Sequence, residues 1–517
     1  MNDQQLKGLV GTEVRGMDWD HPVATTPPAF TASERFLTRL ARRSFLTLWS
    51  YPHVYRDQGI GGRQREGKEV VDLLVVFDHH VILFSDKSCA FPNTGNLDQD
   101  WARWYRRAIE ASAKQLWGAE RWLRTHPDRA FLDKQCSVPL PVPLPPLQAA
   151  HFHRIVVASD ESGLRGARTG GSGTLYIRPD IVGRAHTRRT TDGGMPFAIG
   201  QIDPARGFVH VLDETSLGIV LSTLDTIADF VMYLERKEAL ISSGKLLAAA
   251  GEEDLLGLYL RDVDKDGMHD FVLKTDWEKV VVPEGHWEHY VDSPERAAKE
   301  EADRISYQWD AIIEKFTFHA IAGGLRHQAD TVPTLNEQER AYRLLAREPR
   351  TRRRLLAGAL IEKLAATPRD RLGFRVILPS YPGDPHYVFV LAHESIGSTL
   401  PEYWERRRAI LAGYCKVAKL RFPVATCIVG LATEAGLDVQ KRSEDLVVLD
   451  CSRWTAEDEA EARDIQDVTD WLRAPEMTHT VEAEYPVGPR KRVKPQRNAL
   501  CPCKSGLKFK KCCGRVM

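Results

Sequence analysis

The chain has 517 residues, of which 43% are hydrophobic and 27% are charged, and its 71 basic residues equal its 71 acidic residues in number. A domain usually has about 100–150 residues, so the length predicts several separate cores. The balanced charge excludes a uniformly basic coat for nucleic acid, and no apolar run approaches the roughly 20 residues of a membrane span. The N-terminus shows no secretory signal pattern, so we expect a cytoplasmic protein of bacterial type without a membrane span.

Near the N-terminus, apolar residues at helical spacing predict a helix over residues 31–51. Thr31 and Glu34 form a capping box at its start. Two β-branched runs follow, at residues 70–77 and 80–84, and their separation by a tight turn predicts a pair of strands. At such a turn the side chains of His79 and His80 are expected to be solvated rather than to bind a metal.

This helix with Glu34, followed by KEVVDLLVVF and HVILFSDKS, resembles the PD-(D/E)xK nuclease superfamily, particularly its NERD-like branch. The resemblance covers roughly residues 31–122 and implies a restriction-endonuclease-like α/β domain that cuts phosphodiester bonds with a divalent metal. It implies that Asp72 is a metal ligand and that Lys87 is the lysine of the second strand. Two residues before that lysine the superfamily has a carboxylate, but this sequence has Ser85.

The missing carboxylate leaves several ways to complete a metal site. Asp86 is the nearest acid, yet side chains alternate along a strand, so Asp86 leaves the face that Ser85 and Lys87 share. A bulge at the strand end would return the Asp86 side chain to that face. Without such a bulge, Glu69 or Glu34 would complete the oxygen shell of Mg²⁺ or Mn²⁺. The candidate catalytic residues are therefore Asp72, Lys87, Glu69, Asp86 and Glu34. An inactive nuclease fold and an unrelated α/β domain stay open, because these acids could also cap a helix or lie exposed on strands.

The middle of the chain predicts further α/β segments. An aromatic-rich helix over residues 100–125 carries tryptophans that we expect to pack on the sheet. Five prolines within residues 138–146 then predict an extended spacer, because proline cannot pair inside a sheet. The expected organisation is a nuclease-like domain at 1–135, a proline-rich linker at 136–149, an α/β domain at 150–290, a helix-rich α/β domain at 295–480 and a zinc-binding tail at 490–517.

The C-terminal tail has the strongest pattern in the sequence. Ten basic residues and no acidic residue lie between Arg490 and Arg515, which indicates an anionic or acidic partner. Four cysteines occur in two close pairs with Ser505-Gly506 able to turn the chain between them; they are Cys501, Cys503, Cys512 and Cys513. Four thiolates suit tetrahedral zinc, which can order a peptide too short to have its own core. A redox dithiol is the alternative interpretation.

This cysteine pattern resembles the SEC-C motif, which is found at the end of the bacterial SecA translocation motor and on many unrelated proteins. The resemblance covers only Cys501 to Gly514 and implies a zinc-bound docking module. Two hypotheses follow for the whole chain. It is either a magnesium- or manganese-dependent endonuclease with a zinc tail that holds nucleic acid or a protein partner, or a non-catalytic zinc-containing adaptor. The oligomeric state is not predicted.

Overall fold

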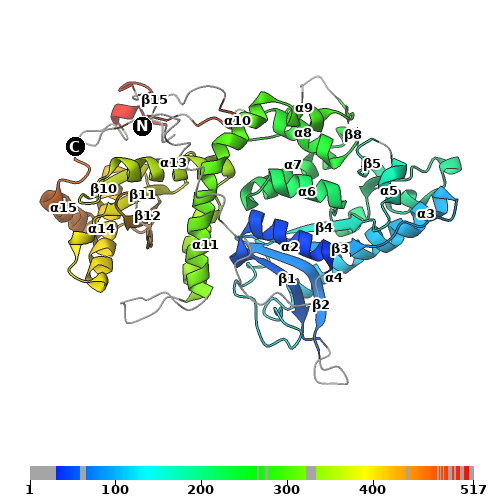
Figure 1. Cartoon of the computed structure of the whole chain (residues 1–517), viewed down its shortest axis with the longest axis horizontal. Helices are drawn as coiled ribbons and strands as arrows, with labels where there is room; N and C mark the ends of the chain where they lie inside the picture. The colour runs from blue at the N-terminus through cyan, green and yellow to red at the C-terminus, as the bar shows by residue number, and fades with distance from the viewer. Residues whose placement is uncertain are drawn as a thin grey trace. The chain divides into compact units, whose positions relative to one another are not determined.

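The computed structural model describes residues 31–58, 66–169, 171–264, 267–273, 278–321, 334–437, 442–473, 477, 479–480, 482–486, 492–493, 496–500 and 506–511. They fall into two compact units (Figure 1). The N-terminal unit contains the described residues of 15–297 and 312–350, and the C-terminal unit contains those of 298–311 and 351–517. Each unit combines helices with a sheet, so the predicted multidomain α/β class is confirmed.

The first described helix, α2 (Ala32–Phe45), begins at the predicted capping box. Thr31 Oγ1 accepts the N–H of Glu34, and Glu34 Oε2 accepts the N–H of Thr31 at 2.7 Å. The helix ends at Phe45 rather than at Tyr51 as predicted, because Leu46 has a positive φ of 63° that a helix cannot accommodate. Residues 50–56 form a strand instead.

The N-terminal unit is built on a five-stranded sheet of order β1-β2-β3-β4-β7. Its strands are β1 (Ser50–Arg56), β2 (Lys68–Phe77), β3 (His80–Ser88), β4 (His151–Ser159) and β7 (His210–Leu212). The first three strands are antiparallel, whereas β4 is parallel to β3 and β7 is parallel to β4. The antiparallel pairing of β2 with β3 confirms the strand pair predicted at 70–77 and 80–84.

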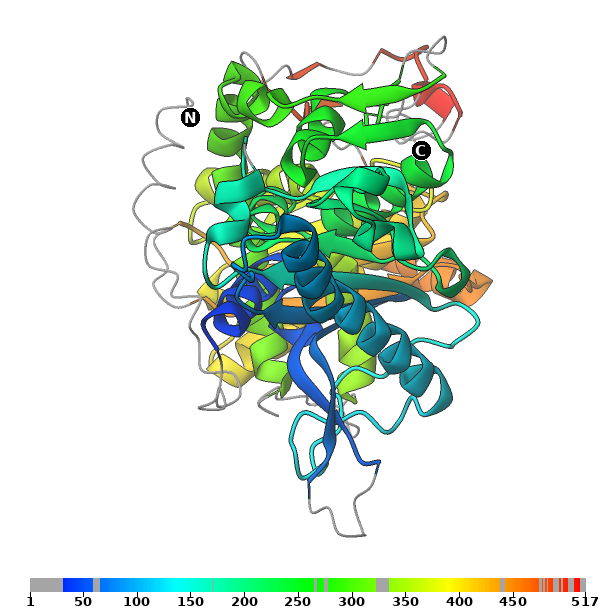
Figure 2. The same ribbon diagram turned by 90° about the vertical axis from the view of Figure 1, so that its right-hand side faces the viewer.

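The central strands β2 and β3 separate part-way along their length. Their paired register ends at Leu73 and Phe84. By contrast β1 and β2 stay paired as far as Arg56 and Lys68, and β3 and β4 as far as Ser88 and Ser159. The sheet therefore forks between β2 and β3, and Figure 2 shows the blue ribbons of β1 and β2 running together away from the other strands.

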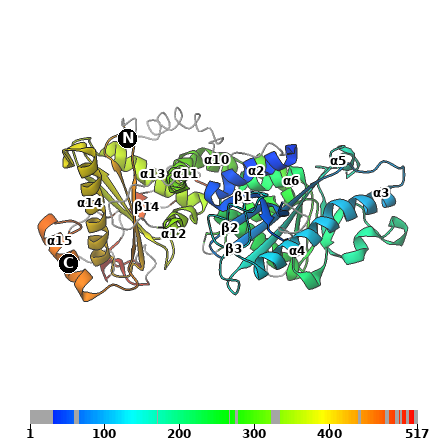
Figure 3. The same ribbon diagram turned by 90° about the horizontal axis from the view of Figure 1, so that it is seen from below.

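Helices cover both sides of this sheet. Helix α2 lies on one side, and α4 (Ala111–Thr125) lies on the other (Figure 3). A π-helical stretch, η3 (Tyr105–Glu110), joins α4 to α3 (Leu97–Trp104), so the predicted aromatic helix is present with a local widening. Its tryptophans are buried, as expected of residues that pack on a sheet; they are Trp101, Trp104, Trp117 and Trp122. Among the helices that the structure describes, none has the length and apolar character needed to cross a bilayer.

The proline-rich stretch lies between two strands that pair with each other. Strand β4 follows it and lies beside β3 in the same sheet, so the segments expected at 1–135 and 150–290 fall in one compact unit. This unit also has a four-stranded sheet of order β6-β5-β8-β9, with strands β5 (Tyr176–Val182), β6 (Ala198–Gln201), β8 (Leu246–Ala249) and β9 (Val280–Val282). The other helices of the unit are α5 (Leu164–Thr169), α6 (Glu214–Thr223), α7 (Ile227–Ser242), α8 (Glu252–Arg261), α9 (His286–Val291) and α12 (Leu335–Ala346).

The C-terminal unit contains a four-stranded sheet of order β10-β11-β12-β13. The strands are β10 (Gly373–Ile377), β11 (His386–Ala392), β12 (Cys427–Glu434) and β13 (Asp445–Asp450), and a two-stranded sheet pairs β14 (His479–Thr480) with β15 (Arg492–Val493). Two further helices are α14 (Leu400–Arg421), which packs on β11 and β12, and α15 (Ala456–Thr469). The helices α10 (Pro294–Asp303), α11 (Tyr307–Ile321) and α13 (Arg350–Ala366) include residues of both units.

Buried arginines of α13 neutralise acids inside the C-terminal unit. Arg353 donates to Asp310 of α11 at 2.6 Å, and both side chains are fully buried. Arg354 donates to Asp303 of α10 at 2.9 Å. The arginine run of residues 352–354 is therefore an internal element and not an exposed patch for nucleic acid.

We predict that Asp310→Ala lowers the free energy of unfolding of the C-terminal unit by about 3–5 kcal/mol, because it breaks a fully buried ion pair by removing one of its two charges. Urea-induced unfolding measures the change. Glu301→Ala is the control, since Glu301 forms an exposed pair with Arg304 and its loss should cost less than about 1 kcal/mol. Equal effects of the two changes would contradict this account of the buried pair.

Candidate functional site

The carboxylate of Asp72 lies where the sheet forks. Beyond the last β2–β3 pair, the N–H of Asp86 donates to Asp72 Oδ2 at 2.6 Å. A side-chain oxygen thus takes the place that a backbone carbonyl holds in a continuous ladder. The pKa of Asp72 is raised to about 7, mainly by burial and also by the negative charges of Glu69, Asp86 and Glu34, while this hydrogen bond lowers it in part.

A bulge in β2 brings Glu69 to the same face as Asp72. The register changes between Val54 and Tyr55 of β1, because Val54 pairs with Val71 whereas Tyr55 pairs with Glu69. Val70 is the extra residue, and Val70 and Val71 are both buried while Glu69 and Asp72 are both partly exposed. Three residues apart, the two acids would lie on opposite faces of a regular strand, and the bulge corrects this.

His53 of β1 completes this part of the site. Its Nδ1 lies 2.6 Å from Glu69 Oε1. Although burial lowers the pKa of His53, the hydrogen bond to Glu69 and the charges of Glu69, Glu34 and Asp72 raise it above its ordinary value overall. His53 also has a positive φ of 51°, beside the bulge. His53 is not among the residues predicted from the sequence, although its position in the aromatic and β-branched run YPHVY indicates that a strand precedes β2.

Asp86 lies on the opposite face of β3 from Ser85 and Lys87. Strand β3 pairs with β4 in unbroken register from His80 to Ser88, so no bulge in β3 moves Asp86 to the expected carboxylate position. Both carboxylate oxygens of Asp86 are buried and have no hydrogen-bond partner of good geometry among the described residues. Burial raises the pKa of Asp86 to about 6, the Ser33 hydroxyl lowers it in part, and Glu34 and Glu214 raise it.

Four of the five candidate residues, all of them acids, lie close enough together at the fork for the other three to influence the charge of Asp72. Glu34, Glu69 and Asp86 each raise the pKa of Asp72. Lys87 is the exposed member, one residue beyond Asp86 on β3. No group of three metal-ligating side chains within 4.8 Å of one another includes these acids, within the part of the chain that the structure describes. The acids therefore surround the fork without forming a closed metal cage.

Two short described parts of the C-terminal tail pair with each other. Leu500 and Lys508 make an antiparallel bridge, and the N–H of Phe509 donates to the carbonyl of Ala499 at 2.8 Å. Gly506 has a φ of 74°, a backbone conformation that glycine adopts without strain. The four expected zinc ligands, Cys501, Cys503, Cys512 and Cys513, lie outside the described residues.

A comparison with protein families identifies this segment. Residues 497–515 match the SEC-C motif. The SEC-C resemblance of the sequence is thereby confirmed for this short part of the chain. A comparison with curated proteins finds no match, and a comparison with solved structures finds none either.

The SEC-C segment is anchored to the C-terminal unit by Phe509. This side chain is buried and belongs to the hydrophobic core cluster that contains Tyr414, Phe422 and Cys451. A short 3₁₀ turn, η9 (Phe509–Lys511), holds it there. This part of the SEC-C segment is therefore packed into the core of the C-terminal unit.

The raised pKa of Asp72 predicts a dependence of stability on pH. Between pH 3.8 and about 7 Asp72 ionises in the unfolded chain but stays protonated in the folded chain, so folding stability falls as pH rises through this window. One such carboxyl group contributes up to about 1.4 kcal/mol per pH unit. Asp72→Asn keeps an oxygen to accept the Asp86 N–H and should flatten the pH dependence, as measured by urea unfolding from pH 5 to pH 8. The exposed substitution Asp128→Asn should keep the wild-type slope, and an unchanged slope in Asp72→Asn would contradict the assignment.

Proposed function

We propose that the N-terminal unit is a metal-dependent nuclease and that the SEC-C segment holds a structural zinc ion and docks a partner. The observation that carries the nuclease proposal is the fork, where Asp72 replaces a backbone acceptor and is surrounded by Glu69, Asp86 and Glu34. The order of helix, strand with Asp72 and strand with Lys87 is the order that the PD-(D/E)xK resemblance implies.

The residues at the fork fit a divalent cation of the magnesium type. Such an ion takes oxygen ligands and keeps several waters, so two or three carboxylates are enough. The Asp72 carboxylate, whose pKa is raised by three neighbouring acids, and the buried carboxylate of Asp86 are groups that a cation would stabilise. Asp72, Asp86 and Glu69 are the candidate ligands. When bound, the ion would lower the pKa of a water molecule and polarise the phosphoryl group.

Lys87, Glu34 and His53 would act at the site without binding the metal ion themselves. Lys87 is exposed near the end of β3, on the face opposite to Asp86, and from there its ammonium group would balance negative charge on a phosphate bound past the strand end. Glu34 is held by its own helix cap, since its carboxylate accepts the N–H of Thr31, so it contributes negative charge to the fork from a fixed position. The His53 contact with Glu69 fixes the orientation of that carboxylate.

Cleavage assays on the full chain test the nuclease proposal. Plasmid, linear duplex, single-stranded DNA and RNA are incubated with Mg²⁺ or Mn²⁺, and at least one should be cut. Asp72→Ala and Lys87→Ala should each lower the cleavage rate about a hundredfold or more, because the first removes a metal ligand and the second removes a cation beside the reacting phosphate. Lys114→Ala is the matched control, since Lys114 pairs with Glu110 on an exposed helix surface and its loss should not change the rate.

Two results would count against the nuclease. One is no cleavage of any substrate by the wild type, and the other is equal cleavage by the wild type, Asp72→Ala and Lys87→Ala. Either result would favour the adaptor hypothesis, in which the α/β units recognise a partner without cutting it. Ser85→Glu adds a sharper comparison, because Ser85 follows the last paired residue Phe84 and stands where the superfamily has its carboxylate. If the nuclease proposal holds, this change should raise metal affinity or activity.

The donor set of the SEC-C segment fits zinc, since four cysteines occur in two pairs on either side of the turn at Gly506. We predict that the purified chain carries one zinc at these cysteines and that Cys501→Ser combined with Cys512→Ser releases it. Elemental analysis measures the metal content. The control is Cys136→Ser, which changes a cysteine far outside the SEC-C segment in sequence and should leave the zinc content as in the wild type. Retention of that zinc in the double variant would exclude the four-cysteine site.

A further inference from the structure

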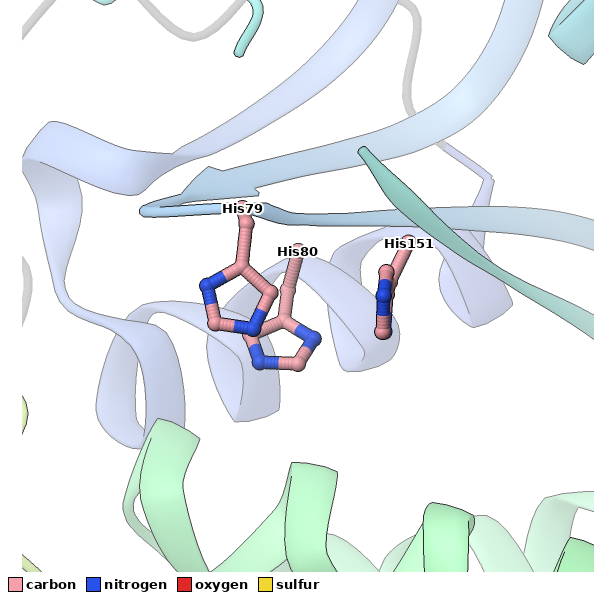
Figure 4. A group of neighbouring side chains, drawn as sticks. All are labelled: His79, His80 and His151. Atoms are coloured by element: carbon pink, nitrogen blue, oxygen red, sulfur yellow. The ribbon is translucent and has the colours of Figure 1, made fainter. Parts of the chain in front are cut away.

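Three histidines gather where the neighbouring strands β3 and β4 of the five-stranded sheet begin, far along the sequence from the SEC-C segment. They are His79 in the turn between β2 and β3, His80 at the start of β3 and His151 at the start of β4 (Figure 4). One ring nitrogen from each lies within 4.8 Å of the other two. The ring centroid of His79 lies 4.0 Å from that of His80 and 5.3 Å from that of His151.

The backbone holds these histidines in register. His80 and His151 are direct partners in the parallel pairing of β3 with β4, and the N–H of His151 donates to the carbonyl of His79 at 2.7 Å. The backbone pairing therefore fixes the positions of the three Cα atoms. Rotation of the side chains would be enough to turn the three rings toward one ion. His79 and His151 keep 46% and 61% of their side-chain surface exposed, which leaves room for that rotation.

Each of the three rings already has a partner on its Nδ1 atom. Asp78 Oδ2 lies 3.1 Å from His79 Nδ1, and Glu235 Oε1 of α7 lies 3.9 Å from His151 Nδ1. The Nδ1 atom of His80 lies 3.0 Å from Nε2 of His153. Metal-binding histidines characteristically have a carboxylate or another polar group on the second ring nitrogen, which fixes the ring and its tautomer. The Nε2 atoms are the nitrogens left to bind an ion.

We propose that His79, His80 and His151 form a binding site for Zn²⁺ or a similar divalent first-row transition ion, with the fourth position open to water. Imidazole nitrogen is a preferred ligand of these ions, whereas Mg²⁺ and Ca²⁺ prefer oxygen. Nitrogens on one tetrahedral zinc ion lie about 3.4 Å apart, because each bond is about 2.1 Å long, so the rings close inward when the ion binds.

The surroundings support this assignment. His153 and Glu235 form a second group of three with His80, so both stand close enough to support the ligands or to exchange with them. Bound metal would join the β2–β3 turn to the start of β4.

Zinc content and zinc affinity of the full chain test the proposal. His79→Ala combined with His151→Ala should remove one equivalent of zinc from the wild type, as measured by elemental analysis after dialysis against Zn²⁺. The same pair of changes, made in the Cys501→Ser and Cys512→Ser background, should lower zinc affinity at least tenfold in a competition assay with a chromophoric chelator. Excess Mg²⁺ should not displace this zinc.

Two matched variants separate this site from other sources of metal binding. His289→Ala changes an exposed histidine of α9, outside the cluster, and should bind zinc like its parent. Asp72→Asn alters the fork and should also leave the histidine-dependent zinc in place. Equal zinc content and equal affinity with and without His79 and His151 would overturn the site. If His289→Ala lost as much zinc as the double variant, the zinc binding would be nonspecific binding to imidazole groups, and the site would likewise be overturned.

Discussion

The hydrogen bond from the Asp86 N–H to the Asp72 carboxylate is the constraint on which the proposed active site depends. Where β2 and β3 separate, backbone donors and acceptors lose their ladder partners, and a buried backbone N–H without a partner is costly. Asp72 meets this need at 2.6 Å. The carboxylate is therefore held at the fork for a structural reason, at the point where burial and neighbouring acids make its charge hardest to sustain.

The local patterns near the N-terminus could be predicted, but the pairing between strands could not. The capping box of Thr31 and Glu34 follows from four consecutive residues, and the β2–β3 pair follows from two apolar runs at a tight turn. The bulge that aligns Glu69 with Asp72 depends on how β1 pairs with β2. The predicted helix extended to Tyr51 and so took in the first two residues of β1, because the positive φ of Leu46 cannot be recognised from the apolar spacing.

Long-range strand pairing also explains two other features that the sequence did not predict, the position of β4 and the histidine cluster. Prolines mark residues 138–146 as unable to join a sheet, but they carry no information on where the chain goes next, and β4 returns to the side of β3. The same return creates the histidine cluster. His151 and His153 are two residues apart on one strand and so share a face, a signal visible in the sequence HFH. Only the parallel register reveals that this face meets His79 and His80.

The burial of Phe509 in the core of the C-terminal unit affects how the SEC-C segment could hold a partner. A module on a loose tether samples many orientations, and a partner that binds it must give up that freedom when the complex becomes ordered. Phe509 belongs to the same core cluster as Tyr414 and Phe422, so this point of the segment is fixed on the unit before any partner binds. The part of the segment around Phe509 would then meet a partner in a preset orientation.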